Sequence, residues 1–426
     1  MRAKTAKRGQ KSAPGLILVL VFVFLLMPFT ACGRRPSGPA CPIKIGVITS
    51  QTGRHAEGGL ESLRGYAMAL EEINASGGVM GCPVELIVKD DRSLPYQAQL
   101  AVKELVNEDQ VSIISGAYSS AATMPAAGVA NAYQIPFLAP TASSDLITAQ
   151  GYEWVFRLIA PASGYANTAL DFVQTIRDEM NIDRLAVIYD DSLYGESAAV
   201  AVAMGAIQRN LDIVAYEEYN PGTANYQALL ERVKAADPDV IYFASYLNEA
   251  IHLLQHSEAV DLNPKVYVGH AGGFIMLEFL QAGKHAEYVI GAAQWAKDVK
   301  WEDERGQTAA MFAERFASRY GVEPGMRSAQ TYTTLYVIKD AIERAGTSES
   351  LEWDDVQSVR LAIRDALRET DLEKTIFGPV NFNQDGENNH PVVLIQVIDG
   401  QFVTVYPERY RAATPIVPVP DWSARP

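Results

Sequence analysis

The sequence predicts an α/β protein with two lobes, each built on a doubly wound parallel sheet. The first observation is length, because 426 residues exceed what a single hydrophobic core usually serves. The second is an alternation of short apolar runs with longer amphipathic segments, which starts near residue 43 and again near residue 184. The third is that the short runs are apolar on both faces, as expected of parallel strands covered by helices on both sides.

Each apolar run predicts a strand, and apolar residues at helical spacing between the runs predict helices. The first helix, for example, carries Leu60, Leu63, Ala67 and Leu70 on one face and ends at Gly77-Gly78. In the first series, strands are expected at 42–49, 83–90, 111–115, 135–138 and 154–158, and helices at 59–75, 95–107, 122–133 and 161–180. In the second series, strands are expected at 184–189, 212–216, 240–243 and 265–268, and helices at 197–210, 226–236 and 248–257.

Residues 1–31 are typical of a signal peptide. Five basic residues precede the uncharged apolar run 16–27, which as a helix would span about 18 Å, short of a bilayer core of roughly 30 Å. The following Phe29-Thr30-Ala31-Cys32 resembles the bacterial lipobox, in which cleavage precedes a cysteine that carries diacylglycerol. We therefore expect Cys32 to be lipidated, residues 32–41 to form a tether, and the protein to be extracytoplasmic. The alternative is an ordinary cleaved signal with an accidental cysteine.

The charge balance argues against a nucleic-acid partner. The formal net charge is −15, with 36 basic against 51 acidic residues, and the signal segment holds five of the basic ones and no acid. Phosphate binding needs a basic face, and this acidic surface would repel polyanions.

Two further cysteines predict a disulfide. Cys41 and Cys82 each directly precede a predicted strand, and the two strands are separated by one helix. In a βαβ unit these strands lie side by side and parallel, which brings their starts within bridging distance. An exported protein meets oxidising conditions, so we expect the Cys41–Cys82 bond. Two free, buried thiols are the alternative.

Ligand sites in this architecture lie at the carboxyl ends of the strands. Three such loops, 50–59, 116–123 and 140–145, are rich in hydroxyl and small residues. Hydroxyls and free N–H groups at a helix N-terminus suit a carboxylate or another small anion. Taken alone, each loop is more typical of a helix cap than of a ligand site. Arg54-His55 either contacts a charged group of the ligand or forms an exposed turn. Together the loops predict a ligand site that includes His55, Tyr118, Ser119, Ser120, Thr141, Ala142 and Ser143.

The chain resembles the type I periplasmic solute-binding proteins, in the branch of the leucine/isoleucine/valine-binding proteins of bacterial ABC importers. The resemblance covers roughly residues 42–407, and rests on the order and spacing of the stretches 45–59, 65–81, 116–127, 135–146 and 186–196. It implies two lobes joined by three crossover strands, near 160–161, 288–293 and 377–382. Lobe one then comprises 42–160 and 292–376, lobe two 161–290 and 380–408, and 409–426 form a C-terminal tail.

The resemblance also implies particular ligand contacts. The serine that holds the ligand carboxylate falls on Ser120, a second hydroxyl falls on Ser143, and two aromatic contacts from lobe two fall on Tyr194 and Tyr246.

Two positions depart from the family pattern. The tryptophan that walls the pocket aligns with Gly58, and the glutamate that meets the ligand ammonium aligns near Ala271. Glu57 or Asp190 remain open as substitutes for the acid, whereas a ligand without an amine needs neither.

The remaining motifs give little support for a metal site or for catalysis. His252 and His256 stand four apart on a predicted helix without a third ligand, so we expect a solvated helix face and no metal or cofactor. No nucleophile elbow or phosphate loop appears, so we expect no enzyme. The prediction is a monomeric, lipid-anchored receptor that closes around an amino acid or related small carboxylate or amide and passes it to an ABC permease and ATPase. A sensing clamp for a membrane receptor and an exported α/β enzyme are the alternatives.

Overall fold

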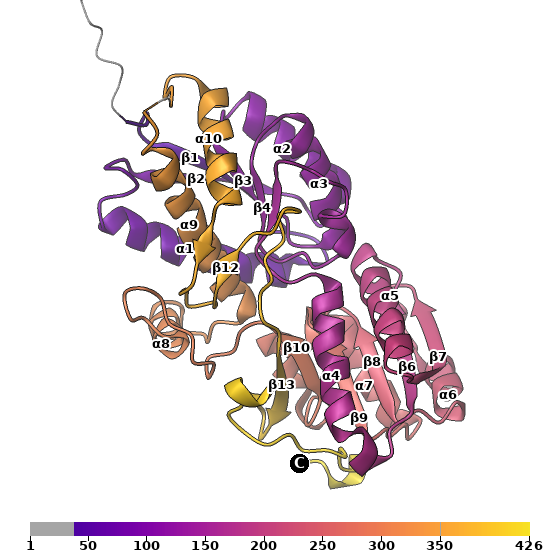
Figure 1. Cartoon of the computed structure of the whole chain (residues 1–426). Helices are drawn as coiled ribbons and strands as arrows, with labels where there is room; N and C mark the ends of the chain where they lie inside the picture. The colour runs from indigo at the N-terminus through magenta and orange to yellow at the C-terminus, as the bar shows by residue number, and fades with distance from the viewer. Residues whose placement is uncertain (1–37, 350) are drawn as a thin grey trace, which may run out of the picture. The chain divides into compact units, whose positions relative to one another are not determined.

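A computed structural model describes residues 38–349 and 351–426. The predicted signal peptide and the lipidation site Cys32 lie outside these residues. The described chain forms two main sheets and their covering helices, shown in Figure 1. Within this part, no helix has both the length and the apolar character needed to cross a membrane.

The first sheet contains five strands in the order β2-β1-β3-β4-β5, all parallel. Its strands are β1 (Ile43–Thr49), β2 (Val84–Asp90), β3 (Ile113–Ser115), β4 (Phe137–Ala139) and β5 (Val155–Arg157). The helices beside it are α1 (Ala56–Ala75), α2 (Pro95–Asn107), α3 (Ser120–Ala132), α9 (Met326–Ala345) and α10 (Val356–Arg368). We call this sheet and its helices lobe one.

Alternating residues of one strand enter different cores in lobe one. Ile45 and Val47 of β1 pack in a cluster with Tyr66 of α1, whereas Ile48 packs in another cluster with residues of α2 and α3 such as Ala98. Successive strand side chains point to opposite faces, so helices on both sides require a strand that is apolar throughout. This is the pattern from which the doubly wound fold was predicted.

Helices α1 and α9 lie in close contact although 250 residues separate them in the chain. The hydroxyl of Thr331 donates a hydrogen bond to the carbonyl of Ser62 at 2.7 Å. A Cβ on Gly65 would lie 2.2 Å from the carbonyl oxygen of Ser328, so this approach requires glycine. The α9 segment thereby becomes part of lobe one.

The second sheet contains seven strands in the order β14-β13-β10-β9-β8-β6-β7. Its strands are β6 (Arg184–Asp190), β7 (Asp212–Tyr219), β8 (Val240–Ala244), β9 (Val266–His270), β10 (Ile290–Ala293), β13 (Val393–Ile398) and β14 (Gln401–Tyr406). Its helices are α4 (Ala162–Met180), α5 (Leu193–Gln208), α6 (Gln227–Ala235) and α7 (Leu247–Ala259). We call this sheet and its helices lobe two. The α/β fold class and the predicted strands and helices are confirmed, with small shifts at their ends.

The second sheet is not parallel throughout, because β13 and β14, which lie beyond the predicted strands, run antiparallel to their neighbours. These two strands form a hairpin whose two connecting residues, Asp399 and Gly400, both have positive φ, at 52° and 69°. A two-residue turn of this kind matches the twist of an antiparallel pair and favours Asp-Gly. The sheet is therefore mixed.

The chain passes between the sheets three times: after β5, after β10, and after the short strand β12. Between β10 and β13 it forms α8 (Ala309–Tyr320), α9, α10 and the two-stranded ribbon of β11 (Asp371–Leu372) and β12 (Val380–Asn381). These passages lie near the three predicted crossings, and the residue boundaries of the lobes stay a prediction. The predicted tail packs on lobe two, where the buried Trp422 donates from Nε1 to the carbonyl of Leu262 at 2.9 Å.

Cys41 and Cys82 form a disulfide, with their Cα atoms 5.2 Å apart. Strands β1 and β2 are adjacent and parallel, and Ile43 pairs with Val84, each two positions after its cysteine. The bond therefore joins the starts of two neighbouring strands, as the sequence predicted.

Candidate functional site

Loops at the carboxyl ends of the strands of both sheets line one small cavity of about 30 Å³. Seven of the nine predicted ligand-binding residues line it, namely Tyr118, Ser120, Thr141, Ala142, Ser143, Tyr194 and Tyr246. The cavity also takes residues to which the sequence analysis assigned no contact, namely Ile159, Tyr165, Ala271, Gly272, Met326, Arg327 and Gln330. Elements distant in the sequence therefore meet in one site.

The loop after β3 presents Ser120 at the N-terminus of α3. Ser119 is the N-cap residue, and its Oγ accepts a hydrogen bond from the backbone N–H of Ala122 at 3.3 Å. Ser119 does not line the cavity, so here the helix-cap interpretation applies. Ser120 is 2% exposed, and its Oγ accepts from the backbone N–H of Ser144 at 3.2 Å. The two hydroxyl-rich loops are thus joined at the cavity wall.

The loop after β4 is held mainly through its backbone. Thr141 donates from Oγ1 to the carbonyl of Tyr118 at 2.9 Å. The fully buried Arg157 donates from Nη1 to the carbonyls of Ser143 at 3.3 Å and Ser144 at 2.5 Å. Its Nη2 pairs with Glu387, which lies between β12 and β13. This network fixes the position of Ser143 from the far side of the loop.

Tyrosine side chains from lobe two form the opposite wall. The hydroxyl of Tyr194 donates to the carbonyl of His270, and the ring centroids of Tyr194 and Tyr246 are 5.0 Å apart. Burial lowers the pKa of His270 to about 3, so its ring is neutral at physiological pH. Asp190 lies at the same edge of this sheet but does not line the cavity. Burial raises the pKa of Asp190 to about 6.

His55 lies beside the cavity and not in it. Its ring centroid is 4.3 Å from that of Tyr246 and 5.8 Å from that of Tyr118. Burial is the main cause that lowers the pKa of His55 to about 3, and the positive charges of Arg54 and Arg327 lower it further. The neighbouring Arg54 of lobe one forms an ion pair with Glu249 of lobe two at 3.4 Å. These contacts join the two lobes next to the candidate site.

Tyr118 occupies the space over Gly58, the position at which the family resemblance placed a missing tryptophan wall. A Cβ on Gly58 would lie 2.2 and 2.3 Å from two ring carbons of Tyr118 and 2.4 Å from its hydroxyl oxygen. The aromatic wall is therefore present, but it comes from the loop after β3 and not from the first turn of α1. This replacement depends on a contact between that loop and α1 and has no local signature in the sequence.

Arg327 is the main residue that the sequence analysis missed. It lies in the first turn of α9 and is 5% exposed, and its Nη2 donates to the carbonyl of Gly272 at 2.8 Å. Glu61 of α1 accepts from the backbone N–H groups of Arg327 at 3.2 Å and Ser328 at 3.3 Å, which caps α9. Helix α9 buries polar residues such as Gln330 on the same faces as apolar ones, so periodicity gave no sign of this role.

No acidic residue lines the cavity at the described positions, including the wall formed by Ala271 and Gly272. Of the two acids left open as substitutes, Glu57 is exposed and lines the adjacent space around His55, and Asp190 is fully buried outside the cavity. Neither substitute reaches the lining.

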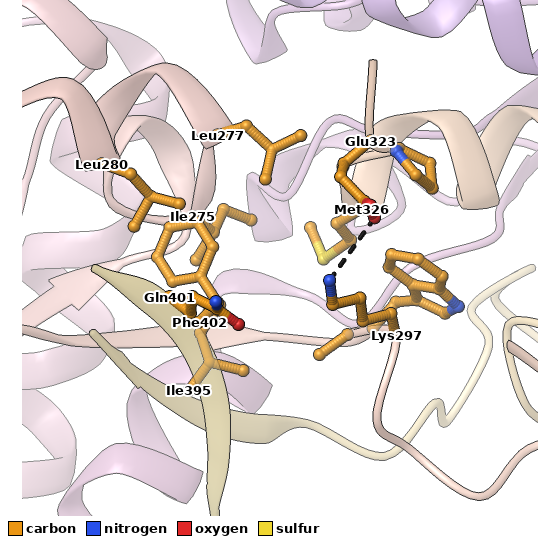
Figure 2. Close-up of a pocket in the computed structure, with 13 residues that line it drawn as sticks. Ile275, Leu277, Leu280, Lys297, Glu323, Met326, Ile395, Gln401 and Phe402 are labelled. Atoms are coloured by element: carbon orange, nitrogen blue, oxygen red, sulfur yellow. Dashed lines mark ion pairs between the residues drawn. The ribbon is translucent and has the colours of Figure 1, made fainter. Parts of the chain in front are cut away.

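A larger cavity of about 320 Å³ lies next to the site and is mostly apolar (Figure 2). Its lining includes the apolar residues Ile275, Leu277, Leu280, Ile395 and Phe402. Met326 lines both cavities. Lys297 and Glu323 form an ion pair across it at 3.5 Å, which satisfies both charges. The residues that the family resemblance implies as ligand contacts line the smaller cavity, so we take it as the candidate site, and at about 30 Å³ it must widen to admit a ligand.

The two histidines of α7 contact each other through the helix backbone. His256 Nδ1 lies 2.8 Å from the carbonyl of His252, as in a helix-backbone contact. Across the described residues, no group of three or more His, Cys, Asp or Glu side chains is placed to hold a metal ion.

The matching family model is described as a periplasmic binding protein, and it covers residues 42–401. The chain belongs to this family. Because the family consists of solute-binding proteins, its membership confirms the prediction that the chain is not an enzyme, and it implies an extracytoplasmic location. The predicted family resemblance is thereby confirmed.

Individual relatives agree with this assignment. The chain is 29% identical over 380 residues to the Leu/Ile/Val-binding protein homolog 7 of Brucella abortus (strain 2308), a match that covers 86% of this chain and 92% of that protein. Among solved structures, the substrate-binding protein LivJ of Streptococcus pneumoniae in complex with isoleucine has a TM-score of 0.73 at 23% identity, over 88% of this chain and 99% of that one. A solute-binding protein of R. palustris in complex with benzoate has a TM-score of 0.73 at 16% identity, over 85% and 95%. The type I fold is therefore shared by proteins solved with chemically different ligands.

Proposed function

We propose that this chain is the substrate-binding receptor of an ABC importer, anchored outside the cytoplasm through a lipid on Cys32. It captures an amino acid or a related small carboxylate or amide in the cavity between the two lobes. The observation that carries the proposal is the convergence of Ser120, Ser143, Tyr194 and Tyr246, from loops of both sheets, on one cavity. The Leu/Ile/Val-binding homologue in Brucella abortus supports the transport assignment.

The proposed mechanism is closure of the lobes over the ligand. The hydroxyls of Ser120 and Ser143, with N–H groups at the start of α3, hold the anionic end, because a helix N-terminus favours negative charge. Tyr194 and Tyr246 cover the ligand from lobe two. The Arg54–Glu249 ion pair and the hydrogen bond between the hydroxyls of Ser144 and Ser197, at 2.5 Å, are contacts that closure makes. Ligand entry then requires these contacts to open.

Thermal unfolding with a ligand panel tests the binding function. The panel contains branched and aromatic amino acids, their amides and small carboxylates, added to the purified full chain in mild detergent. A ligand at a hundred times its dissociation constant adds about 2.7 kcal/mol, which raises the melting temperature of a protein this size by about 3 °C. Absence of any shift across the panel would contradict the proposal.

The anchor is tested separately by mass spectrometry and membrane fractionation. The wild-type chain is expected to carry diacylglycerol on Cys32 and to sediment with membranes. The Cys32→Ala variant is expected to lose the lipid and appear in the soluble fraction. A Cys32→Ala protein that stays in the membrane would contradict the lipid anchor without affecting the binding proposal.

A further inference from the structure

Arg327 places a buried positive charge in the wall of the candidate site, and Glu61, at 3.9 Å from its Nη1, pairs with it only at long range. Its Nη1 has no hydrogen-bond partner within the described part of the chain, although the residue is only 5% exposed. Burial acts to lower the pKa of Arg327, but Tyr118 and Glu61 outweigh this effect and raise it, so the guanidinium is charged. A buried charged donor without an acceptor is costly, and such groups are often completed by a ligand.

The nearest acid does not neutralise this charge fully. Glu61 Oε2 lies 3.9 Å from Arg327 Nη1, beyond hydrogen-bonding distance. Its other oxygen, Oε1, already accepts two backbone N–H groups at the start of α9. Burial raises the pKa of Glu61, against the opposing effect of the nearby Arg327. Glu61 therefore positions α9 and leaves the guanidinium face open for another anion.

Other charged groups around the cavity are engaged elsewhere. Arg54 is paired with Glu249 at 3.4 Å, and His55 is neutral at physiological pH. Asp190 accepts hydrogen bonds from Ser192 and lies outside the lining. Among the residues that line the cavity, Arg327 is the one that carries a full charge at neutral pH. An ammonium group entering this space would meet a cation and no carboxylate.

The remaining walls suit an apolar and preferably flat body. Four tyrosines line the cavity, namely Tyr118, Tyr165, Tyr194 and Tyr246, together with Ile159 and Met326. The guanidinium carbon of Arg327 lies 5.3 Å from the centroid of the Tyr118 ring, which sets its planar group beside an aromatic face. Gln330 adds a buried amide whose nitrogen and oxygen both lack partners among the described residues. The site thus offers one cation, one amide and aromatic surfaces.

We propose that the ligand is an organic carboxylate with an apolar body and no α-ammonium group, and that Arg327 binds its carboxylate. This inference rests on the proposed binding function and narrows its ligand class. The guanidinium can bind a carboxylate through two parallel N–H donors. The hydroxyls of Ser120 and Ser143 then complete the polar end of the same cavity.

Matched ligand pairs that differ in the α-ammonium group test this inference. Isothermal titration of the wild-type full chain compares L-phenylalanine with 3-phenylpropanoate, and L-leucine with 4-methylpentanoate, with benzoate as a flat acid and 3-phenylpropanamide as an uncharged analogue. The acids without the amine are expected to bind at least tenfold more tightly than their amino-acid partners. The amide is expected to bind at least tenfold more weakly than 3-phenylpropanoate.

Variants assign the effect to Arg327. Arg327→Gln is expected to weaken binding of the preferred acid at least tenfold, and Arg327→Lys to restore part of the loss. Arg64→Gln is the matched control, since Arg64 is exposed on α1, and it is expected to bind as the wild type does. Circular dichroism and melting temperature establish whether Arg327→Gln folds. If Arg327→Gln does not fold, the inference is decided by the affinities of Arg327→Lys together with those of the wild-type chain for the matched ligand pairs.

The outcomes separate this inference from the binding function. Tighter binding of phenylalanine or leucine than of their deaminated partners would overturn the inference and leave the receptor proposal standing. Equal affinities of folded Arg327→Gln and wild type for the acid would also overturn it. Binding of none of these ligands by the wild-type chain would overturn both.

Discussion

Removal of the Cys41–Cys82 disulfide is expected to lower the free energy of unfolding by about 4 kcal/mol. The two cysteines are 41 positions apart. In the chain-entropy treatment, releasing a loop of this length returns about 13 cal/mol/K to the unfolded chain, or about 4 kcal/mol at 25 °C. Unfolding entropy is about 2.1 cal/mol/K per residue, hence about 0.8 kcal/mol/K for a protein of roughly 390 folded residues. The melting temperature should therefore fall by about 5 °C.

Differential scanning calorimetry of wild type and the double variant Cys41→Ser/Cys82→Ser measures this shift. Wild type is scanned with and without a phosphine reductant, and the reduced protein should melt close to the variant. The variant itself should not respond to the reductant, which controls for effects of the reagent. Ligand affinity should stay the same, because neither cysteine lines the candidate cavity.

A change of less than about 1 °C would refute the reasoning. That result would mean that the bond does not form in the protein, or that the unfolded chain keeps β1 and β2 close without it. A free-thiol count on the denatured, unreduced protein separates these explanations. Thiols at both positions would show that the bond is absent.

Three further predictions concern the site. Ser120→Ala is expected to weaken ligand binding at least tenfold in calorimetric titration while costing only about 1 kcal/mol of stability, because the backbone N–H of Ser144 loses one acceptor. Asp190→Asn is expected to raise the free energy of unfolding at pH 7.5 by about 2–3 kcal/mol. Burial raises the folded-state pKa of Asp190 to about 6, so the charged form is disfavoured in the folded protein. Melting curves should show that wild type loses this stability as the pH rises from about 4 to about 6, and that the variant does not. Gly58→Ala is expected to destabilise the protein, because its Cβ would overlap the Tyr118 ring, and the double variant Gly58→Ala/Tyr118→Ala should recover part of the loss in the same assay.

The fold was largely predictable because burial on both faces leaves a direct mark on the sequence. Ile45, Val47 and Ile48 are all apolar since β1 meets helices on both sides. The antiparallel β13–β14 hairpin was missed although its local signal, Asp399-Gly400 between apolar runs, is present in the sequence. The predicted strands end at 265–268, so β13 and β14 were not among them.

The site was predictable only where it follows from strand ends. The loops that carry Ser120 and Ser143 were predicted because loops at the carboxyl edge of a parallel sheet converge. The family resemblance implied these two serines as ligand contacts. Arg327 was not predicted, because α9 reaches the site through its packing on α1, a contact between segments that are far apart in the chain. The role of Ser119 as a cap was also undecidable, since capping and ligand binding both call for a hydroxyl at a helix N-terminus.

The way Arg157 holds the loop after β4 has a consequence for how this protein can be re-engineered. Its guanidinium binds the main-chain carbonyls of Ser143 and Ser144, which every residue type possesses. The side chains of Ala142 and Ser143 face the cavity and take no part in that anchoring. A library that randomises these two positions can therefore search for new ligand preferences on an unchanged backbone. At this loop, the side chains that line the cavity can therefore be changed separately from the backbone that carries them.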